Sequence, residues 1–271
     1  MKNINYLIVI TLFILVSKNK LQSQNIIPRH DSFTIESKQV NETRVIAVWT
    51  PDSYNNGSDS FPVLYMPDGG VKEDFPHIAN TIAKLIEQKS ISPIILVGIE
   101  NTERGRDLTA ASEIEDDAKY CPLSNGAENF RNFITEELFS VIAKKYRVTD
   151  KKGIIGESLA GLFVMETFMN KPQSFDFYIA MDPSLWWNNH YLVRNADTLL
   201  NNLPNRETKL WFAGSNAEDI SPYTKKISKI LQKKVTNKLK WKYSNEPNEK
   251  HNTIFRATKE KALIWTLNIN K

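Results

Sequence analysis

The segment GIIGESLAGLF (residues 153–163) joins a short apolar run to a serine that has small residues on both sides. Such an apolar run is typical of a strand buried on both faces of a sheet, and the residues after Ser158 suit a helix. A sharp strand-to-helix turn strains the backbone of its central residue, so the residues two before and two after it must be small. Gly156 and Ala160 meet this requirement. The segment therefore predicts a strand–turn–helix unit with Ser158 at the turn; the alternative is a serine that only caps a helix.

Strands and helices alternate on both sides of this unit. Residues 32–40 and 43–51 alternate polar and apolar positions, which predicts an antiparallel pair with one solvated face. Further strands are expected at residues 62–66, 92–98, 153–156, 177–181, 209–213 and 239–243, and helices at residues 75–88, 128–146, 223–232 and 259–267. This alternation predicts an α/β fold with a mixed, mostly parallel sheet and helices on both faces.

The N-terminus has the pattern of a targeting segment. Residues 6–16 form an 11-residue apolar run behind Lys2. This run is shorter than the roughly 20 residues of a membrane span, and it suits the apolar part of a signal peptide. We therefore expect a cleaved signal peptide at residues 1–23 and a single domain at residues 24–271, periplasmic or secreted, with no membrane span after cleavage.

Composition excludes several classes of protein. Hydrophobic residues make up 41% and charged residues 24% of the 271, which is ordinary for a globular protein. Removing residues 1–23 takes away three lysines and no acidic residue, so the formal net charge falls from +4 to +1. No basic cluster then indicates nucleic-acid binding. The single cysteine, Cys121, excludes an intrachain disulfide. No motif requires a metal or another cofactor.

A serine becomes a nucleophile only with a general base, and the chain has four histidines: His30, His77, His190 and His251. Catalytic groups in a doubly wound sheet lie at the carboxyl ends of the strands. His251 lies in a predicted loop between the last strand and the last helix, which also gives the order serine, acid, histidine of α/β-hydrolases. We therefore predict that His251 is the base.

The acid that orients the base is expected after the penultimate strand, where Glu218 and Asp219 are adjacent. Either carboxylate would accept a hydrogen bond from the imidazole Nδ1–H and stabilise the imidazolium. Glu218 is preferred because Pro222, four residues on, resembles the usual layout of the acid loop in α/β-hydrolases. The alternative is that both are charges at a helix N-terminus.

An oxyanion hole needs two backbone N–H donors. Leu159 supplies the first, since it follows the serine at a helix N-terminus. The second is expected from the loop after residues 62–66, at Gly70 or Gly69, because glycine lets the backbone approach a substrate closely. The alternative is a plain turn, which the same sequence would also form.

Several segments together resemble the putative-esterase family of α/β-hydrolases, the group that contains esterase D and trilactone-siderophore esterases. They are VLYMPDGG (63–70), IENTERGRDLTA (99–110), ENFRNFITEELFSVIAKKYRV (128–148), GESLAGLF (156–163), FDFYIAMDPSLWW (175–187) and EKHNTIF (249–255). The chain departs from the family pattern at Glu157, where His or Arg is usual, at Ala160, where Gly is usual, and at Ala110, where Pro is usual.

The resemblance implies an α/β-hydrolase fold and a serine mechanism. It also implies a substrate role for Arg106 and Arg104, since arginine pairs with anionic or catecholate groups. The alternative for Arg106 is a structural ion pair with Asp107. Trp186 and Trp187 are expected to form an aromatic wall for a flat acyl group or a sugar, and the alternative is that they belong to the core.

We therefore predict an exported serine esterase that forms an acyl-enzyme and acts on a small-molecule or oligosaccharide ester. A siderophore-type lactone is the first candidate, and the acetyl or feruloyl esters of plant polysaccharides are the second. Transfer of the acyl group to another alcohol is a third. The rival is a catalytically silent ligand-binding module on the same fold, because Glu157 beside the serine could repel anionic substrates. The acyl group, the alcohol and the oligomeric state stay open.

Overall fold

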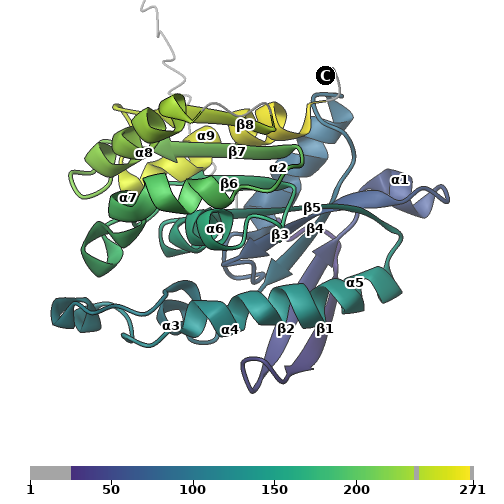
Figure 1. The fold of residues 1–271 in the computed structure, drawn as a ribbon. Helices are drawn as coiled ribbons and strands as arrows, with labels where there is room; N and C mark the ends of the chain where they lie inside the picture. The colour runs from purple at the N-terminus through teal and green to yellow at the C-terminus, as the bar shows by residue number, and fades with distance from the viewer. Residues whose placement is uncertain (1–25, 235–237, 269–271) are drawn as a thin grey trace, which may run out of the picture.

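The structure is a computed structural model that describes residues 26–234 and 238–268. The predicted signal peptide at residues 1–23 lies outside the described residues. The centre of the molecule is a sheet with the strand order β1-β2-β4-β3-β5-β6-β7-β8 (Figure 1). The strands are β1 (Asp31–Ser37), β2 (Glu42–Trp49), β3 (Phe61–Pro67), β4 (Ile95–Ile99), β5 (Val148–Glu157), β6 (Phe177–Met181), β7 (Thr208–Gly214) and β8 (Leu239–Asn245). β2 is antiparallel to β1 and β4, and the pairs from β4 to β8 are parallel. The predicted mixed, mostly parallel sheet is therefore confirmed.

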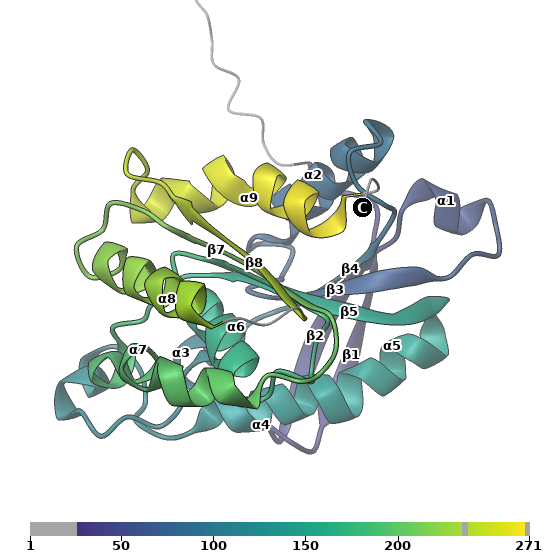
Figure 2. The same cartoon turned by 45° about the horizontal axis from the view of Figure 1, so that its top comes forward.

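Helices cover both faces of the sheet. They are α1 (Asp52–Asn55), α2 (Phe75–Glu87), α3 (Arg104–Leu108), α4 (Gly126–Asn132), α5 (Phe139–Lys145), α6 (Leu159–Asn170), α7 (Trp187–Leu199), α8 (Ser221–Lys233) and α9 (His251–Leu267), with short 3₁₀ turns η1 (Glu115–Lys119) and η3 (Leu200–Asn202). A π-helical turn, η2 (Phe133–Leu138), joins α4 to α5. Figure 2 shows α2 and α9 together on one face, whereas α4 to α8 lie on the other. None of the helices in the described ranges is both long and apolar enough to span a bilayer.

The apolar runs of the strands follow from this two-sided cover. Successive side chains of a strand point to opposite faces. In β3, Val63 and Tyr65 pack in the cluster beneath α4 to α8, and Leu64 and Met66 pack in the cluster beneath α2 and α9. All four are at most 1% exposed. A central strand buried on both faces therefore needs a continuous apolar run rather than an alternating one.

The structure extends the last helix beyond its predicted range. The helix was expected from residue 259, but α9 begins at His251. Ile254 and Phe255 are buried against the sheet, so the first turn is held by packing. The Lys250 N–H also donates to Thr253 Oγ1 at 2.9 Å, and this hydrogen bond caps the N-terminus of the helix. His251 is therefore the first residue of a helix rather than part of a loop.

Candidate active site

Ser158 lies at a tight turn between β5 and α6. Its backbone has φ 59° and ψ −120°, a conformation that L-residues rarely adopt. Three hydrogen bonds hold it there, from its own N–H to the Met181 carbonyl and to its carbonyl from the N–H groups of Leu162 and Ser184. A Cβ at Gly156 would lie 2.5 Å from the Ala160 carbonyl carbon, so glycine is required there. The predicted strained strand–turn–helix unit is therefore present.

The structure brings His251 to this serine. His251 Nε2 lies 3.0 Å from Ser158 Oγ, which is hydrogen-bond distance. On the other side of the ring, Nδ1 lies 2.8 Å from Asp182 Oδ2. Ser158, His251 and Asp182 thus form one continuous line of hydrogen bonds, which is the arrangement that lets an imidazole take a hydroxyl proton.

Asp182 is fully buried directly after β6, at the carboxyl end of the strand beside β5. Besides His251, its carboxylate accepts hydrogen bonds from Ser215 N–H at 2.6 Å and from Ser215 Oγ at 2.7 Å. Ser215 directly follows β7, so the loops after two neighbouring strands fix the carboxylate in one orientation.

The predicted acid, Glu218 or Asp219, is thereby corrected to Asp182. Glu218 is exposed, and Asp219 lines the hollow beside Ser158 without bonding to His251 Nδ1. The loop that was predicted to hold the acid, after β7, supplies Ser215, which bonds to the carboxylate. The carboxylate itself comes from the end of β6. A local signal for Asp182 does exist, since it follows its strand as directly as Ser158 follows β5.

The surroundings tune the charges at His251. The hydrogen bond to Asp182 raises the pKa of His251 above its ordinary value; burial opposes this, and the charge of Glu157 adds to it. Glu157 itself is held at a pKa of about 7, chiefly because burial disfavours its charged form. Its Oε1 atom lies 3.7 Å from His251 Nε2. The imidazole therefore has a carboxylate near each ring nitrogen.

The two predicted sources of oxyanion donors differ in the structure. Leu159 is the first residue of α6, where helix N–H groups have no partner within the helix. In contrast, the Gly70 N–H donates to Glu73 Oε2 at 2.7 Å, and the Gly69 N–H donates to the Ile99 carbonyl at 2.9 Å. Both glycine amides are therefore occupied, and neither residue lines the described hollow beside Ser158.

That hollow has a volume of about 600 Å³. Its wall includes Arg104, Tyr120 and Trp186 beside Ser158 and His251. The Tyr120 and Trp186 rings lie 5.2 Å apart between centroids. Trp186 therefore lies where an aromatic wall was predicted. Over the described ranges, no group of His, Cys, Asp or Glu side chains is arranged to hold a metal ion.

Comparison with known proteins places the chain in a family. The family model described as Putative esterase matches residues 37–270. The chain belongs to this esterase family. Ferri-bacillibactin esterase BesA of Bacillus subtilis (strain 168) is 31% identical over 185 residues, which are 63% of this chain and 64% of the relative. The chain thus spans less than two thirds of the length of this relative.

Solved structures of two similar proteins share the fold. The BES protein from Bacillus cereus has a TM-score of 0.79 and 25% identity, covering 90% of this chain and 98% of that one. An IroE-like serine hydrolase from Shewanella oneidensis has a TM-score of 0.76 and 24% identity, covering 88% of this chain and 80% of that one. The α/β-hydrolase fold is therefore shown for this member of the esterase family.

The second predicted tryptophan lies in the core of this esterase-family chain. Trp187 is buried, and its Nε1–H donates to the Ala110 carbonyl at 2.9 Å. It thus fixes the segment after α3 against the start of α7 rather than facing the hollow. Of the tryptophan pair, Trp186 alone lines the hollow beside Ser158.

The two predicted arginines also have different surroundings. Arg104 lines the hollow and forms a two-pronged ion pair with Asp68, in which both N–O distances are 2.7 Å. Arg106 does not line the hollow; its guanidinium pairs with Glu42 and Asp107. The structure therefore leaves Arg104 as the arginine beside the serine and places Arg106 in an ion-pair network.

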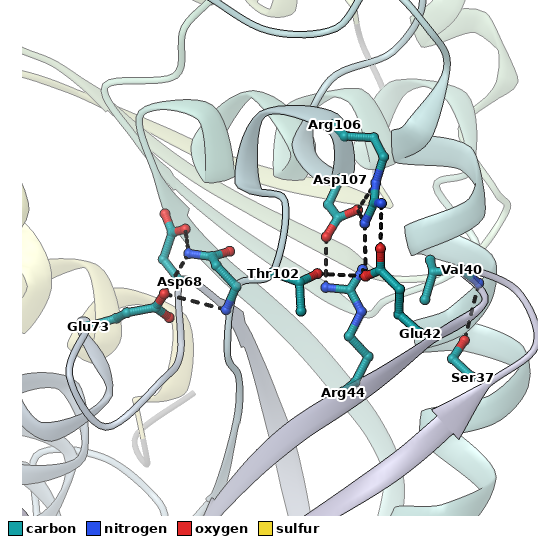
Figure 3. A network of polar contacts seen from close by, with 10 residues as sticks. Ser37, Val40, Glu42, Arg44, Asp68, Glu73, Thr102, Arg106 and Asp107 are labelled. Atoms are coloured by element: carbon teal, nitrogen blue, oxygen red, sulfur yellow. Dashed lines mark hydrogen bonds and ion pairs between the residues drawn. The ribbon is translucent and has the colours of Figure 1, made fainter.

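This network ties α3 to β2, as Figure 3 shows. Arg44 is fully buried, and its guanidinium lies 2.7 Å from Asp107 and 3.1 Å from Glu42. Arg106 pairs with the same two carboxylates from the more exposed side. Two arginines thus share two acids, and a buried arginine depends on Asp107 for its nearest counter-charge.

Asp107→Ala is expected to lower the free energy of unfolding by about 3 kcal/mol, because it leaves the buried Arg44 charge without its nearest partner. Arg106→Gln is the matched control, and it should cost only about 1 kcal/mol because its side chain is partly solvated. Urea denaturation followed by circular dichroism measures both. Equal losses in the two variants would contradict this account of the network.

Proposed function

We propose that this chain is an exported serine hydrolase that cleaves carboxylic esters through an acyl-enzyme. The observation that carries the proposal is the line of hydrogen bonds from Ser158 through His251 to Asp182. These residues come from the ends of β5 and β6 and from the start of α9. Membership of an esterase family and the name of the relative BesA, a ferri-bacillibactin esterase, support the same reaction.

The geometry suggests the following steps. His251 Nε2 takes the Ser158 proton while Oγ attacks the ester carbonyl, and Asp182 stabilises the imidazolium that forms. The Leu159 N–H is aimed at the developing oxyanion from the first turn of α6. His251 then gives its proton to the leaving alkoxide. Water, deprotonated by His251, attacks the acyl carbonyl; the bond to Ser158 Oγ breaks, His251 returns the proton to Oγ, and the carboxylic acid leaves.

The second predicted oxyanion donor, the Gly70 N–H, is bonded to Glu73 in the structure, and Gly70 does not line the hollow beside Ser158. The Gly70 N–H becomes available only when its hydrogen bond to Glu73 breaks. Glu73 also accepts a hydrogen bond from Asn101 Nδ2 at 2.8 Å, so it has another partner to keep. We propose that, when the substrate binds, the Gly70 N–H breaks its hydrogen bond to Glu73 and donates to the substrate oxygen instead.

A siderophore-type lactone with an aromatic acyl group is the proposed substrate class. Trp186 and Tyr120 offer a wall for a flat ring, and Arg104 lies beside them for an acidic hydroxyl group. The name of BesA, a ferri-bacillibactin esterase, points to the same class. The aromatic wall also favours one second candidate, a feruloyl ester of a plant polysaccharide.

Fluorophosphonate labelling of residues 24–271, mapped by peptide mass spectrometry, tests the proposed mechanism. We expect an adduct on Ser158 that is lost in His251→Ala. A folded protein in which Ser158 stays unlabelled would instead indicate a ligand-binding module on this fold. With labelling established, rates on a catecholate trilactone and on a feruloyl sugar would separate the two substrate classes.

Export is proposed from the apolar run at residues 6–16. When the full chain is expressed in a Gram-negative bacterium, we expect the exported protein to begin at Gln24. Its intact mass, measured by mass spectrometry of the periplasmic fraction or the medium, checks this. A protein that keeps Met1 and stays in the cytoplasm would show that the segment is not a cleaved signal.

A further inference from the structure

Glu157 is a second carboxylate at the catalytic histidine. It is the last residue of β5 and directly precedes Ser158. Its side chain is only 19% exposed, and its Oε1 atom lies 3.7 Å from His251 Nε2. The nitrogen that faces Ser158 Oγ at 3.0 Å therefore also faces a carboxylate. Asp182 occupies the other ring nitrogen, so the two carboxylates act on different N–H groups.

Several of the other charged groups around Glu157 already have partners. Charged and titratable groups face it from α3 (Arg104), from the start of α2 (Asp74 and His77), from the end of β6 (Asp182) and from α9 (His251 and Arg256). Arg104 is paired with Asp68, and Asp74 Oδ1 lies 2.8 Å from His77 Nε2. Within residues 26–234 and 238–268, the side chain of Glu157 makes no hydrogen bond. His251 is therefore its nearest partner.

We propose that Glu157 is a positioning residue that holds the Nε2 proton of protonated His251 and so sets the pH below which Ser158 lacks a base. This inference rests on the proposed serine mechanism. In the protonated imidazole, the Nε2–H can be directed to the Glu157 carboxylate. That proton must leave before Nε2 can accept the Ser158 proton. The pair therefore delays activation until the pH rises past the raised pKa of the imidazole.

The sign of the effect follows from charge. A carboxylate within about 4 Å of an imidazole stabilises its charged form and raises its pKa. Glu157 is one of the groups that raise the pKa of His251. Glu157 carries its charge from about pH 7 upward, because its pKa is about 7. Glu157→Gln keeps the shape but removes that charge, so the pKa of His251 falls. The neutral base is then available at lower pH. On the acid limb, where the reaction rate falls as the pH is lowered, the pH of half-maximal rate therefore moves down by about one unit.

The test is the rate of inactivation by a neutral fluorophosphonate as a function of pH, because this needs no knowledge of the substrate. In Glu157→Gln, we expect the half-maximal rate about one pH unit lower than in the wild type. The rates should agree at high pH, where His251 is neutral in both proteins. Glu218→Gln, which removes an exposed carboxylate outside the hollow, should leave the profile unchanged.

Three outcomes are distinguishable. Superimposable profiles of wild type and Glu157→Gln would overturn this inference and leave the serine mechanism standing. Failure of the wild type to react at any pH would overturn the proposed function itself. If Glu157→Gln does not fold, Glu157→Asp replaces it. Its shorter side chain places the carboxylate farther from Nε2, so a smaller downward shift is expected and an unchanged profile would contradict the inference.

Discussion

Asp182→Asn is expected to lower kcat/KM for a simple activated ester by about 10⁴-fold. The Asp182 carboxylate accepts the hydrogen bond from His251 Nδ1 at 2.8 Å. An asparagine amide in the same place can donate to Nδ1 instead, which leaves the proton on Nε2, the wrong nitrogen for taking the Ser158 proton. Steady-state hydrolysis of p-nitrophenyl acetate at a pH above the acid limb measures the loss.

Matched variants of the two neighbouring acids make this prediction specific. Glu218→Gln and Asp219→Asn each remove one negative charge from the loop that follows β7. Each should change kcat/KM by only a few-fold, because neither carboxylate bonds to His251 Nδ1 in the structure. A loss in Asp219→Asn as large as that in Asp182→Asn would contradict the hydrogen-bonded line described here.

Ser158→Ala is expected to lower kcat by about 10⁶-fold, because it removes the atom that forms the acyl-enzyme. The backbone donors of the site remain, so a small residual rate over the uncatalysed reaction should persist. Alanine keeps the same strained backbone conformation, and the fold should be unaffected. Ester hydrolysis on protein checked by circular dichroism measures the effect.

The double variant Ser158→Ala/Asp182→Asn tests whether these residues act as one unit. Without the Ser158 hydroxyl, His251 has no proton to take, so its orientation no longer affects the rate. The double variant should therefore be no slower than Ser158→Ala alone. A further loss in the double variant of a hundredfold or more would show that Asp182 acts through something other than Ser158. The same data would then argue against the proposed acyl-enzyme.

Most of the fold could be predicted from local patterns. The strands β3, β4, β6 and β7 are apolar over most of their length because they are buried on both faces. β1 alternates because one of its faces is more exposed, but the solvated face predicted for β2 is wrong over residues 46–49, which are buried on both faces of the sheet. The turn at Ser158 was also predictable, since its strained backbone leaves room only for small residues at Gly156 and Ala160. The start of α9 was not predictable, because its first turn is held by the burial of Ile254 and Phe255.

The residues of the candidate site were predictable where the local sequence identifies a single residue. They were not predictable where the role depends on contact between two segments that are distant in the sequence. The sequence by itself determined Ser158, through the sterics of its turn, and His251, through its place after the last strand. Only the tertiary structure decided that Asp182 rather than Glu218 or Asp219 reaches His251, because this depends on which strand end lies under the start of α9. Pairing of this kind joins residues 69 positions apart, and no local periodicity encodes it.

The dependence on tertiary packing also explains the outcomes of the predictions for Arg104, Arg106 and Gly70. Arg104 and Arg106 are two residues apart in one sequence motif, yet one lines the hollow and the other completes an ion-pair network with β2. The Gly70 amide was expected to be free, and only the fold brings Glu73 to it. Local sterics and hydrophobic periodicity depend on residues that are close in the sequence, so the sequence determined the sheet and the serine turn. Partners of charges and amides are set by which elements pack together, so the tertiary structure alone decided them.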